Sequence, residues 1–245
     1  MSDWLRYEWE WERQPAVFRV DLQYWELLPT LAYSHLIYIA CAPKNPRAVS
    51  FSRAEERCFS ALSNALSETL QKSALYVGTV ELNALRQLYF YTSDPSLIKV
   101  ASALCRAEQK LSITCGQVEE TDYVTYYTFL FPDDAKLQSV ENASFIQEVA
   151  RHNGDVDLVR RITMMMTFPT FEGREAYLKH LPKTGLVAGV SETIRHPSHP
   201  FCVTVHGYST LHLMDLNRCT ARAIRSAAVY DGMLERLDAD FIERH

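Results

Sequence analysis

The chain has 245 residues, a formal net charge of −5 and a hydrophobic fraction of 47%, which is typical of a folded globular protein with one large or two ordinary domains. No apolar run approaches the roughly twenty residues that a membrane span requires, and the first residues do not resemble a signal peptide, so we expect a cytoplasmic protein. The mild acidity argues against a nucleic-acid binder that neutralises many phosphates and is compatible with a basic protein partner.

The cysteines are scattered along the chain without a CxxC pair, and most of them lie inside apolar runs. This pattern favours reduced, packed thiols over a disulfide framework or a zinc site. The six residues are Cys41, Cys58, Cys105, Cys115, Cys202 and Cys219.

The first predicted element is a strand at residues 5–12, because apolar and charged side chains alternate there with a period of two. Aromatic side chains occupy one face of this strand, and the other face carries mostly acids. A turn leads to a second apolar segment at residues 17–20, so we expect a hairpin. The acidic row has two interpretations, a solvated face and a docking strip for a partner. It consists of Glu8, Glu10 and Glu12.

Further apolar segments complete the first half of the chain. Ser52 and Glu55 have the spacing of a capping box and predict the start of a helix, and a second helix is expected to start at Ser93 or Asp94. The order of these elements indicates an antiparallel α+β layer and not a doubly wound parallel sheet. The remaining strands are predicted at residues 33–42, 75–82, 88–92, 111–118 and 123–131.

A domain boundary is expected near residues 133–142, which gives a first domain at 1–132 and a second at 133–245. A helix begins at this boundary, and its polar segment at residues 138–142 predicts an interruption. Residues 162–168 are apolar or β-branched throughout, which indicates an inner strand that is covered on at least one face. The three consecutive methionines in this strand are expected in the core, with an adaptable contact surface as the alternative.

The elements after this strand are marked by caps and turn residues. Thr170 is a plausible N-cap for a helix, and Gly185 can adopt the left-handed turn that returns the chain as a strand at residues 186–190. A final helix follows through residues 216–228. The charged tail at residues 234–245 is expected to be only half-ordered.

The second half of the chain, over about residues 140–235, resembles the family of the regulator of ribonuclease E activity B. The order of elements and a closing Tyr-Asp-Gly motif carry this resemblance, although Met233 stands where the family usually has an aromatic residue. The matching features are Gly154-Asp155, residues 162–168, Arg174-Glu175, Gly185-Leu186-Val187 and Tyr230-Asp231-Gly232.

The first half resembles an uncharacterised bacterial domain that is often fused upstream of that regulator domain. This resemblance covers residues 3–132, and the combined architecture is more specific than either half alone. The matching features are Asp3-Trp4, Val20-Asp21, Asn45-Pro46, Tyr76-Val77-Gly78, Leu88-Tyr89-Phe90-Tyr91 and residues 129–132.

The resemblance implies an α+β protein of two mixed or antiparallel α/β sandwich domains, of which the second is ferredoxin-like. It implies a non-catalytic protein, without a cofactor, that inhibits a nuclease by stoichiometric contact. Related two-domain architectures resemble immunity proteins that neutralise a toxin nuclease, so regulator and immunity protein both stay open. Neither direct nucleic-acid binding nor a membrane is expected, and the oligomeric state is open.

Acidic and aromatic residues near the end of the first domain are a candidate contact surface for a basic nuclease. Tyrosines would anchor such a contact and carboxylates would steer association, although a turn followed by a core strand explains the same residues equally well. The predicted partner-binding residues are Glu8, Glu10, Glu12, Glu119, Glu120, Asp122, Tyr123, Tyr230 and Asp231, with Tyr126 and Tyr127 in the same aromatic segment.

The alternative to an inhibitor is a metal-dependent hydrolase that uses His196, His199 and His206. Imidazole and thiolate are good zinc ligands, and Cys202 lies in the same stretch. The spacing matches no closed zinc pattern, and two prolines stiffen the loop, so the simpler interpretation is a loop without metal. The chain contains no G-x-S-x-G motif, glycine-rich phosphate loop or H-E-x-x-H helix.

Overall fold

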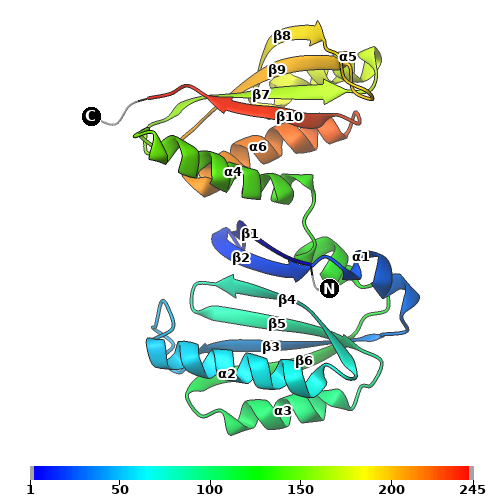
Figure 1. Cartoon of the computed structure of the whole chain (residues 1–245), viewed down its shortest axis with the longest axis vertical. Coiled ribbons are helices and arrows are strands. Elements are labelled where there is room, and N and C mark those ends of the chain that lie inside the picture. Colours follow the sequence, from blue (N-terminus) through cyan, green and yellow to red (C-terminus); the bar gives the residue numbers. More distant parts are fainter. Residues whose placement is uncertain (1–2, 243–245) are drawn as a thin grey trace. The chain divides into compact units, whose positions relative to one another are not determined.

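The computed structural model describes residues 3–242 and divides into two compact units between Pro132 and Asp133 (Figure 1). Helices and strands are mixed in both units, and the strand pairings between described residues are all antiparallel. The predicted α+β class is therefore confirmed. Among the described helices, none combines the length and the apolar character that are needed to cross a bilayer.

The first unit contains a six-stranded sheet in the order β1-β2-β4-β5-β3-β6. The predicted hairpin is confirmed, because β1 and β2 pair from Trp4 opposite Asp21 to Trp11 opposite Gln14. Its two-residue turn places both central residues at positive φ, as a type I′ turn requires. The strands are β1 (Trp4–Trp11), β2 (Gln14–Asp21), β3 (His35–Pro43), β4 (Ala74–Leu82), β5 (Leu85–Thr92) and β6 (Leu111–Glu119).

Two helices, α2 (Arg53–Leu70) and α3 (Leu97–Ala107), pack side by side on one sheet face, over β5, β3, β6 and the beginning of β4 (Figure 1). The predicted capping box is confirmed, since the Ser52 hydroxyl accepts from Glu55 N and the Glu55 carboxylate accepts from Ser52 N. The start of α3 is later than predicted. The Asp94 carboxylate accepts a hydrogen bond from Ser96 N in the turn before the helix, and the helix begins after Ser96.

The predicted strand at residues 123–131 is wrong. A π-helical segment, η2 (Thr125–Leu130), stands there and packs beneath the sheet. Tyr126 and Leu130 are four residues apart, so one helical turn buries both on the same side. The Tyr126 hydroxyl donates to Asp21 O at 2.7 Å, and the Tyr7 hydroxyl donates to Leu130 O at 2.7 Å. Two short helical segments that were not predicted, α1 (Tyr24–Leu27) and η1 (Leu28–Thr30), precede β3.

The second unit is a four-stranded sheet in the order β10-β7-β9-β8. β7 is an inner strand, as predicted, and Met164 and Met166 are buried in the core while Met165 points to the opposite, half-exposed face. The strands are β7 (Arg160–Phe168), β8 (Val187–Thr193), β9 (Phe201–Ser209) and β10 (Met233–Ala239). The helices are α4 (Asp134–Arg151), α5 (Phe171–His180), η3 (Leu181–Thr184) and α6 (Leu213–Ala228).

The expectation of a half-ordered tail is wrong up to residue 239. β10 forms an edge strand on β7, with Met233 opposite Thr167 and Ala239 opposite Ile162. An antiparallel edge strand with one solvated face tolerates alternating charges, which explains why a charged sequence is ordered there. Residues 243–245 lie outside the described part of the chain.

The predicted interruption of the helix at residues 138–142 is also wrong, because α4 is continuous. Asn142 is fully buried against α6, and its side-chain amide donates to Asn217 Oδ1 at 2.8 Å and to Thr220 Oγ1 at 2.9 Å. Buried polar groups that bond to each other do not disrupt a helix. The polar segment is therefore part of the α4–α6 interface.

Caps and turns around α5 follow the sequence. The Thr170 hydroxyl accepts from Gly173 N at 3.0 Å, and Gly185 has φ +74°, so both predictions are confirmed. Arg174 is buried, although helical periodicity places it among the charged residues of α5. Its guanidinium lies 4.9 Å over the Phe171 ring and donates to Glu192 O at 3.3 Å.

Candidate protein-binding surface

Part of the sheet in the first unit is not covered by α2 and α3. The core cluster under these helices reaches β4 at Ala74 and Tyr76, and the same face of β1, β2 and the rest of β4 lies outside it. Trp4 is 43% exposed there, and the Arg6 and Arg19 side chains are each 54% exposed. We refer to this surface as the β1-β2-β4 face. Its side chains are Trp4, Arg6, Glu8, Arg19, Tyr76 and Glu81.

The β1-β2-β4 face contains a shallow pocket of about 500 Å³ that Trp4, Arg6, Arg19 and Tyr76 line. The ring centroids of Trp4 and Tyr76 are 5.2 Å apart at an angle of 47°. Tyr76 is fixed from behind, because its ring stacks on Phe90 and its hydroxyl bonds to Thr79. Burial is the main cause that raises the pKa of Tyr76, so the hydroxyl is neutral at pH 7.

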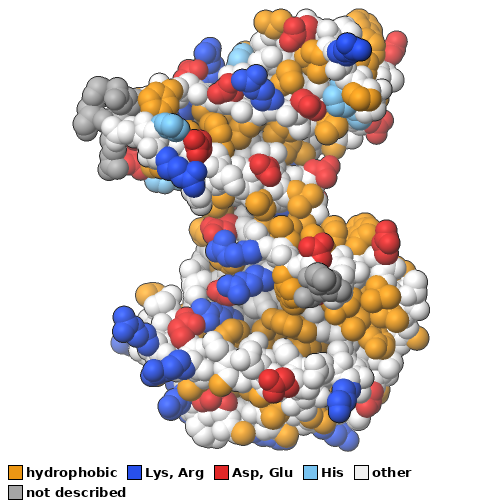
Figure 2. Space-filling model, viewed as in Figure 1, with side chains coloured by type: hydrophobic (Ala, Val, Ile, Leu, Met, Phe, Trp, Pro, Cys, Tyr) orange, Lys and Arg blue, Asp and Glu red, His pale blue; other side chains and the backbone are white. Residues whose placement is uncertain are grey.

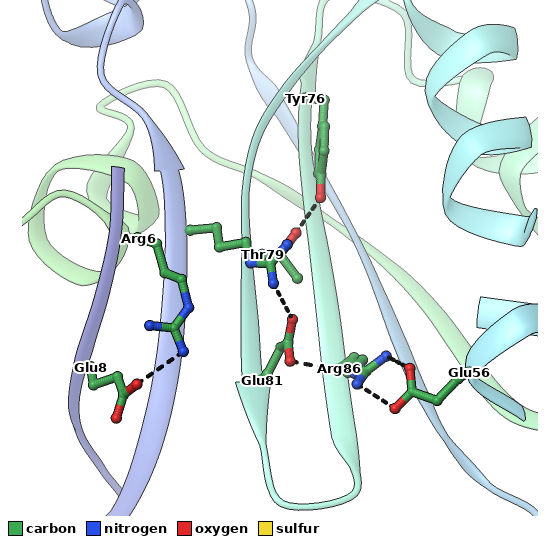
Figure 3. A network of polar contacts seen from close by, with 8 residues as sticks. Arg6, Glu8, Glu56, Tyr76, Thr79, Glu81 and Arg86 are labelled. Atoms are coloured by element: carbon green, nitrogen blue, oxygen red, sulfur yellow. Dashed lines mark hydrogen bonds and ion pairs between the residues drawn. The ribbon is translucent and has the colours of Figure 1, made fainter. Parts of the chain in front are cut away.

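Ion pairs lie on the same face in separate groups (Figure 3). Arg6 contacts Glu8 at 2.9 Å, and Arg19 contacts Glu81 at 3.6 Å. Arg86 extends the Arg19–Glu81 group to α2, because its guanidinium contacts both Glu81 and Glu56. Exposed pairs of this kind contribute at most about 1 kcal/mol each. Arg6 and Arg19 can therefore exchange their carboxylate partners for those of another protein at little cost.

Arg86 differs from the two exposed arginines. Its side chain is only 17% exposed, and its guanidinium lies 4.7 Å from the Phe51 ring centroid and 4.9 Å from that of Phe59. These contacts hold the guanidinium in one orientation, so it forms a fixed edge to the β1-β2-β4 face.

The predicted acidic row lies on this face but is not purely acidic. Glu8 and Glu10 are half-buried, and Glu12 is exposed in the hairpin turn. Arg6 and Arg19 stand opposite each other in the register of β1 and β2, so cations alternate with the carboxylates. Figure 2 shows basic, acidic and hydrophobic side chains interspersed over the visible surface of the first unit. An acidic docking strip therefore stays a prediction, with arginines within it.

The second predicted set of contact residues lies at the end of β6, which is the opposite edge of the sheet from β1. Glu119 and Asp122 are exposed there. The Glu120 carboxylate is used in hydrogen bonds within the first unit. It accepts from the Tyr91 hydroxyl, from Thr125 N at 2.8 Å and from the Thr125 hydroxyl at 2.7 Å. Burial first, and then the bond to Glu120, raises the pKa of Tyr91.

The prediction that Tyr123 is an exposed contact residue is wrong. This residue is 5% exposed, and its hydroxyl donates to Leu31 O at 2.5 Å. Tyr126 is buried as well, and Tyr127 donates to Trp25 O at 2.8 Å. Large rings in a short helical segment fill the space beneath the sheet, so Tyr123 and Tyr126 are core residues and not free anchors, whereas Tyr127 is half-buried at the margin of this core.

Tyr230 and Asp231 follow the end of α6. Gly232 N donates to Ala227 O at 3.0 Å, and Asp231 has the left-handed φ of +55° that closes a helix in this way. The Tyr230 ring lies 6.5 Å from that of Tyr177. The Tyr-Asp-Gly motif is thus explained by a helix end, and a contact with a partner stays a prediction for the exposed Asp231 side chain.

The structure brings His196 and His199 together, with ring centroids 5.6 Å apart, but their ring nitrogens and those of His206 contact different partners. His196 Nε2 lies 3.7 Å from Glu235, His199 Nε2 contacts Asp231 O at 3.2 Å, and His206 Nδ1 contacts Thr163 Oγ1 at 3.2 Å. Cys202 is fully buried, and burial is the first cause that raises the pKa of its thiol. Within residues 3–242, no group of three His, Cys, Asp or Glu side chains is placed to hold a metal ion.

Comparison with known proteins places the first unit in a family. The sequence model of DUF695, a family of unknown function, matches residues 2–131. The chain belongs to the DUF695 family. No curated protein matches the sequence. A structural comparison aligns the chain with the crystal structure of an unknown protein from Galdieria sulphuraria at a TM-score of 0.22 and 10% identity, over 86% of this chain and 99% of that one. A likeness this weak carries no inference.

The residues that match DUF695 include the whole β1-β2-β4 face. The sequence pattern predicts part of this face. Trp4 and Arg6 continue the even-numbered face of the acidic row, and a two-residue turn at Glu12 and Arg13 fixes Arg19 opposite Arg6. Tyr76 was not predictable in this way, because the pairing of β2 with β4 joins strands that are distant in sequence.

The structural role of Glu120 in the DUF695 unit leads to a testable prediction. We expect Glu120→Ala to lower the free energy of unfolding of this unit by about 1–2 kcal/mol, because the buried Tyr91 hydroxyl and Thr125 N lose their acceptor. Urea unfolding followed by tryptophan fluorescence measures the change. The exposed neighbour is the control, and Glu119→Ala should change the midpoint little. Equal midpoints for both variants would contradict the role of Glu120.

Proposed function

We propose that this protein is a non-catalytic inhibitor that binds a nuclease in a stoichiometric complex, either as an immunity protein or as a regulator of an endoribonuclease. The observation that supports a protein contact best is the β1-β2-β4 face. Trp4 and Tyr76 form an aromatic pair in a surface pocket that Arg6 and Arg19 also line. Trp, Tyr and Arg are the residue types that carry most of the binding energy at protein interfaces.

The charges on this face suit a partner with a basic surface. Glu8 pairs with Arg6, Glu81 pairs with Arg19 and with the more buried Arg86, and Glu12 is exposed in the hairpin turn. Approach of a basic protein would offer the carboxylates new cations, while Arg6 and Arg19 turn to acceptors on the partner. Such complementarity raises the association rate and sets the orientation of the complex. Glu119, Asp122 and Asp231 are further acidic contacts that we propose for the same class of partner.

We further infer a ferredoxin-like fold for the second unit. Its elements follow the order β7-α5-β8-β9-α6-β10, and the first strand of this series lies between the fourth and the third. The β-α-β-β-α-β order is that of ferredoxin-like domains. This supports the relation to ribonuclease regulators that the sequence resemblance implies.

The aromatic pair provides the first test of the proposal. We expect Trp4→Ala to lower the affinity for the partner about tenfold or more, because truncating an interface tryptophan removes more than about 1.4 kcal/mol of binding energy. The partner would be captured on the immobilised full chain from an extract of the source organism and identified by mass spectrometry. Its dissociation constant for each variant would then be measured by biolayer interferometry.

The control for this test is Tyr208→Ala. Tyr208 is an exposed aromatic residue on β9 of the second unit, so its truncation removes a similar ring from a different surface. We expect the affinity of this variant to match that of the original protein. If Tyr208→Ala weakens binding and Trp4→Ala does not, the contact lies on the second unit and the assignment to the β1-β2-β4 face is wrong.

A further inference from the structure

A second pocket of the first unit lies between the last turn of α3 and the strand β6. It has a volume of about 400 Å³, and both Cys105 and Cys115 line it. Cys105 is in the last turn of α3, and Cys115 is in the middle of β6 on the face that α3 covers. Ser102, Arg106 and Lys44 line the same pocket. The two thiols come from different elements and share one solvent-connected space.

The two cysteines have different surroundings. Cys105 is buried, whereas Cys115 is partly exposed to the pocket. Hydrogen bonding with Cys105 is the main cause that lowers the pKa of Cys115 below that of an ordinary thiol. The Ser102 hydroxyl and the charge of Arg106 act in the same direction. The hydrogen bond and burial raise the pKa of Cys105.

A third thiol lies nearby and differs from both. Cys41 on β3 is fully buried, and burial is the first cause that raises its pKa to about 12. Cys41 does not line the pocket, and its thiol stays protonated at neutral pH. The accessible thiolate of this cluster is therefore expected on Cys115, with Cys105 as the thiol beside it.

We propose that Cys105 and Cys115 form a redox-sensitive dithiol site for small peroxides, in which Cys115 reacts with the oxidant and Cys105 resolves the product. The pocket admits a molecule of the size of hydrogen peroxide or a small organic hydroperoxide. The Arg106 guanidinium and the Ser102 hydroxyl are donors beside the reacting sulfur. A low-pKa, accessible cysteine next to a resolving cysteine is the arrangement of peroxide-sensing proteins.

The reaction consumes one peroxide for each disulfide. The Cys115 thiolate attacks one peroxide oxygen, the O–O bond breaks, and an S–O bond forms. The alkoxide or hydroxide that leaves takes up a proton, so the products are the Cys115 sulfenic acid and an alcohol or water. The Cys105 thiol then attacks the sulfenic sulfur, the S–O bond breaks, and water leaves as the disulfide forms. Two thiols are oxidised and one peroxide is reduced. The bond would tie the last turn of α3 to β6.

Two measurements on the full, reduced chain test this proposal. First, iodoacetamide should label Cys115 about tenfold faster than Cys58 at pH 7, because the lowered pKa of Cys115 leaves more of it as the thiolate, which is the reactive form. Cys58 is a suitable reference because it is also half-buried, but lies on α2. Second, one equivalent of hydrogen peroxide should lower the intact mass by two hydrogens, and peptide mapping should find Cys105 linked to Cys115.

Variants separate the two roles. In Cys105→Ser, peroxide followed by dimedone should give an adduct on Cys115, because the sulfenic acid is no longer resolved. In Cys115→Ser, neither the adduct nor the disulfide should form, while Cys58→Ser should behave like the original chain. Circular dichroism of each variant confirms that it is folded. Equal labelling of Cys115 and Cys58, a disulfide between other cysteines, or oxidation without a Cys105–Cys115 link would overturn the proposal.

Discussion

Asn142→Ala is expected to lower the free energy of unfolding of the second unit by about 3 kcal/mol. The Asn142 side chain is fully buried between α4 and α6, and it bonds to both Asn217 and Thr220. Alanine removes these bonds and leaves Asn217 Oδ1 without this donor in a site that water does not reach. It also leaves a cavity, which adds to the loss.

The chain allows this loss to be assigned to one unit. All four tryptophans, Trp4, Trp9, Trp11 and Trp25, lie in the first unit. Tryptophan fluorescence therefore reports on the first unit, whereas far-ultraviolet circular dichroism reports on both. In urea, Asn142→Ala should lower the unfolding midpoint of the second unit, which circular dichroism detects. The midpoint measured by tryptophan fluorescence should not change. The control is Ser144→Ala on the exposed side of α4, which should change neither signal. A wild-type midpoint for Asn142→Ala would contradict the role of the network.

Gly232→Ala is expected to destabilise the second unit by about 2–3 kcal/mol, because the new methyl group overpacks the core. A Cβ atom at this position would lie 2.3 Å from Phe168 Cε1, and Phe168 is fully buried in β7. Either the ring or the end of α6 has to move. Thermal unfolding followed by circular dichroism measures the effect.

Asp231 provides a matched variant whose expected effect on the stability of the second unit is of opposite sign. Asp231 has φ +55°, a conformation that glycine adopts without strain, so Asp231→Gly should stabilise the second unit by about 0.5–1 kcal/mol. If both variants destabilise the unit equally, the Tyr-Asp-Gly motif does not act through the helix end. If Asp231→Gly instead stabilises the unit but weakens a partner complex, Asp231 has both a conformational and a contact role.

The elements that local sequence determines were predictable. Alternation identified β1, and the capping box at Ser52 and the cap at Thr170 marked two helix starts, because these signals involve residues at most three positions apart. The predictions of secondary structure are wrong where tertiary contacts determine the local conformation. Residues 125–130 form a helical segment because Tyr126 and Leu130 have to fill the space beneath a sheet whose strands are distant in sequence. The polar part of α4 is stable only because α6 supplies partners for Asn142.

The candidate site was predictable to a similar extent. The position of the acidic row on one face of β1 follows from alternation, although Glu8 and Glu10 are only half-exposed, and the register of the hairpin places Arg19 opposite Arg6. Tyr76 and Glu81 join them only through the pairing of β2 with β4. The Cys105–Cys115 pair depends on how α3 lies on β6, which a sequence pattern does not fix. The sequence predicts a contact surface for Glu120 and Tyr123, since their hydrogen bonds to Tyr91 and Leu31 span 29 and 92 residues and leave no local pattern.

A titration of the captured nuclease with the purified chain is the most direct test of the proposed inhibition. The residual nuclease activity would be measured against the molar ratio of the two proteins, at concentrations well above the dissociation constant. Stoichiometric inhibition predicts a linear decrease that reaches the baseline at one equivalent, with a shallower curve for Trp4→Ala. Full activity at a several-fold excess of the chain would contradict the proposal, and so would complete loss of activity at a small fraction of one equivalent, since that would indicate catalysis.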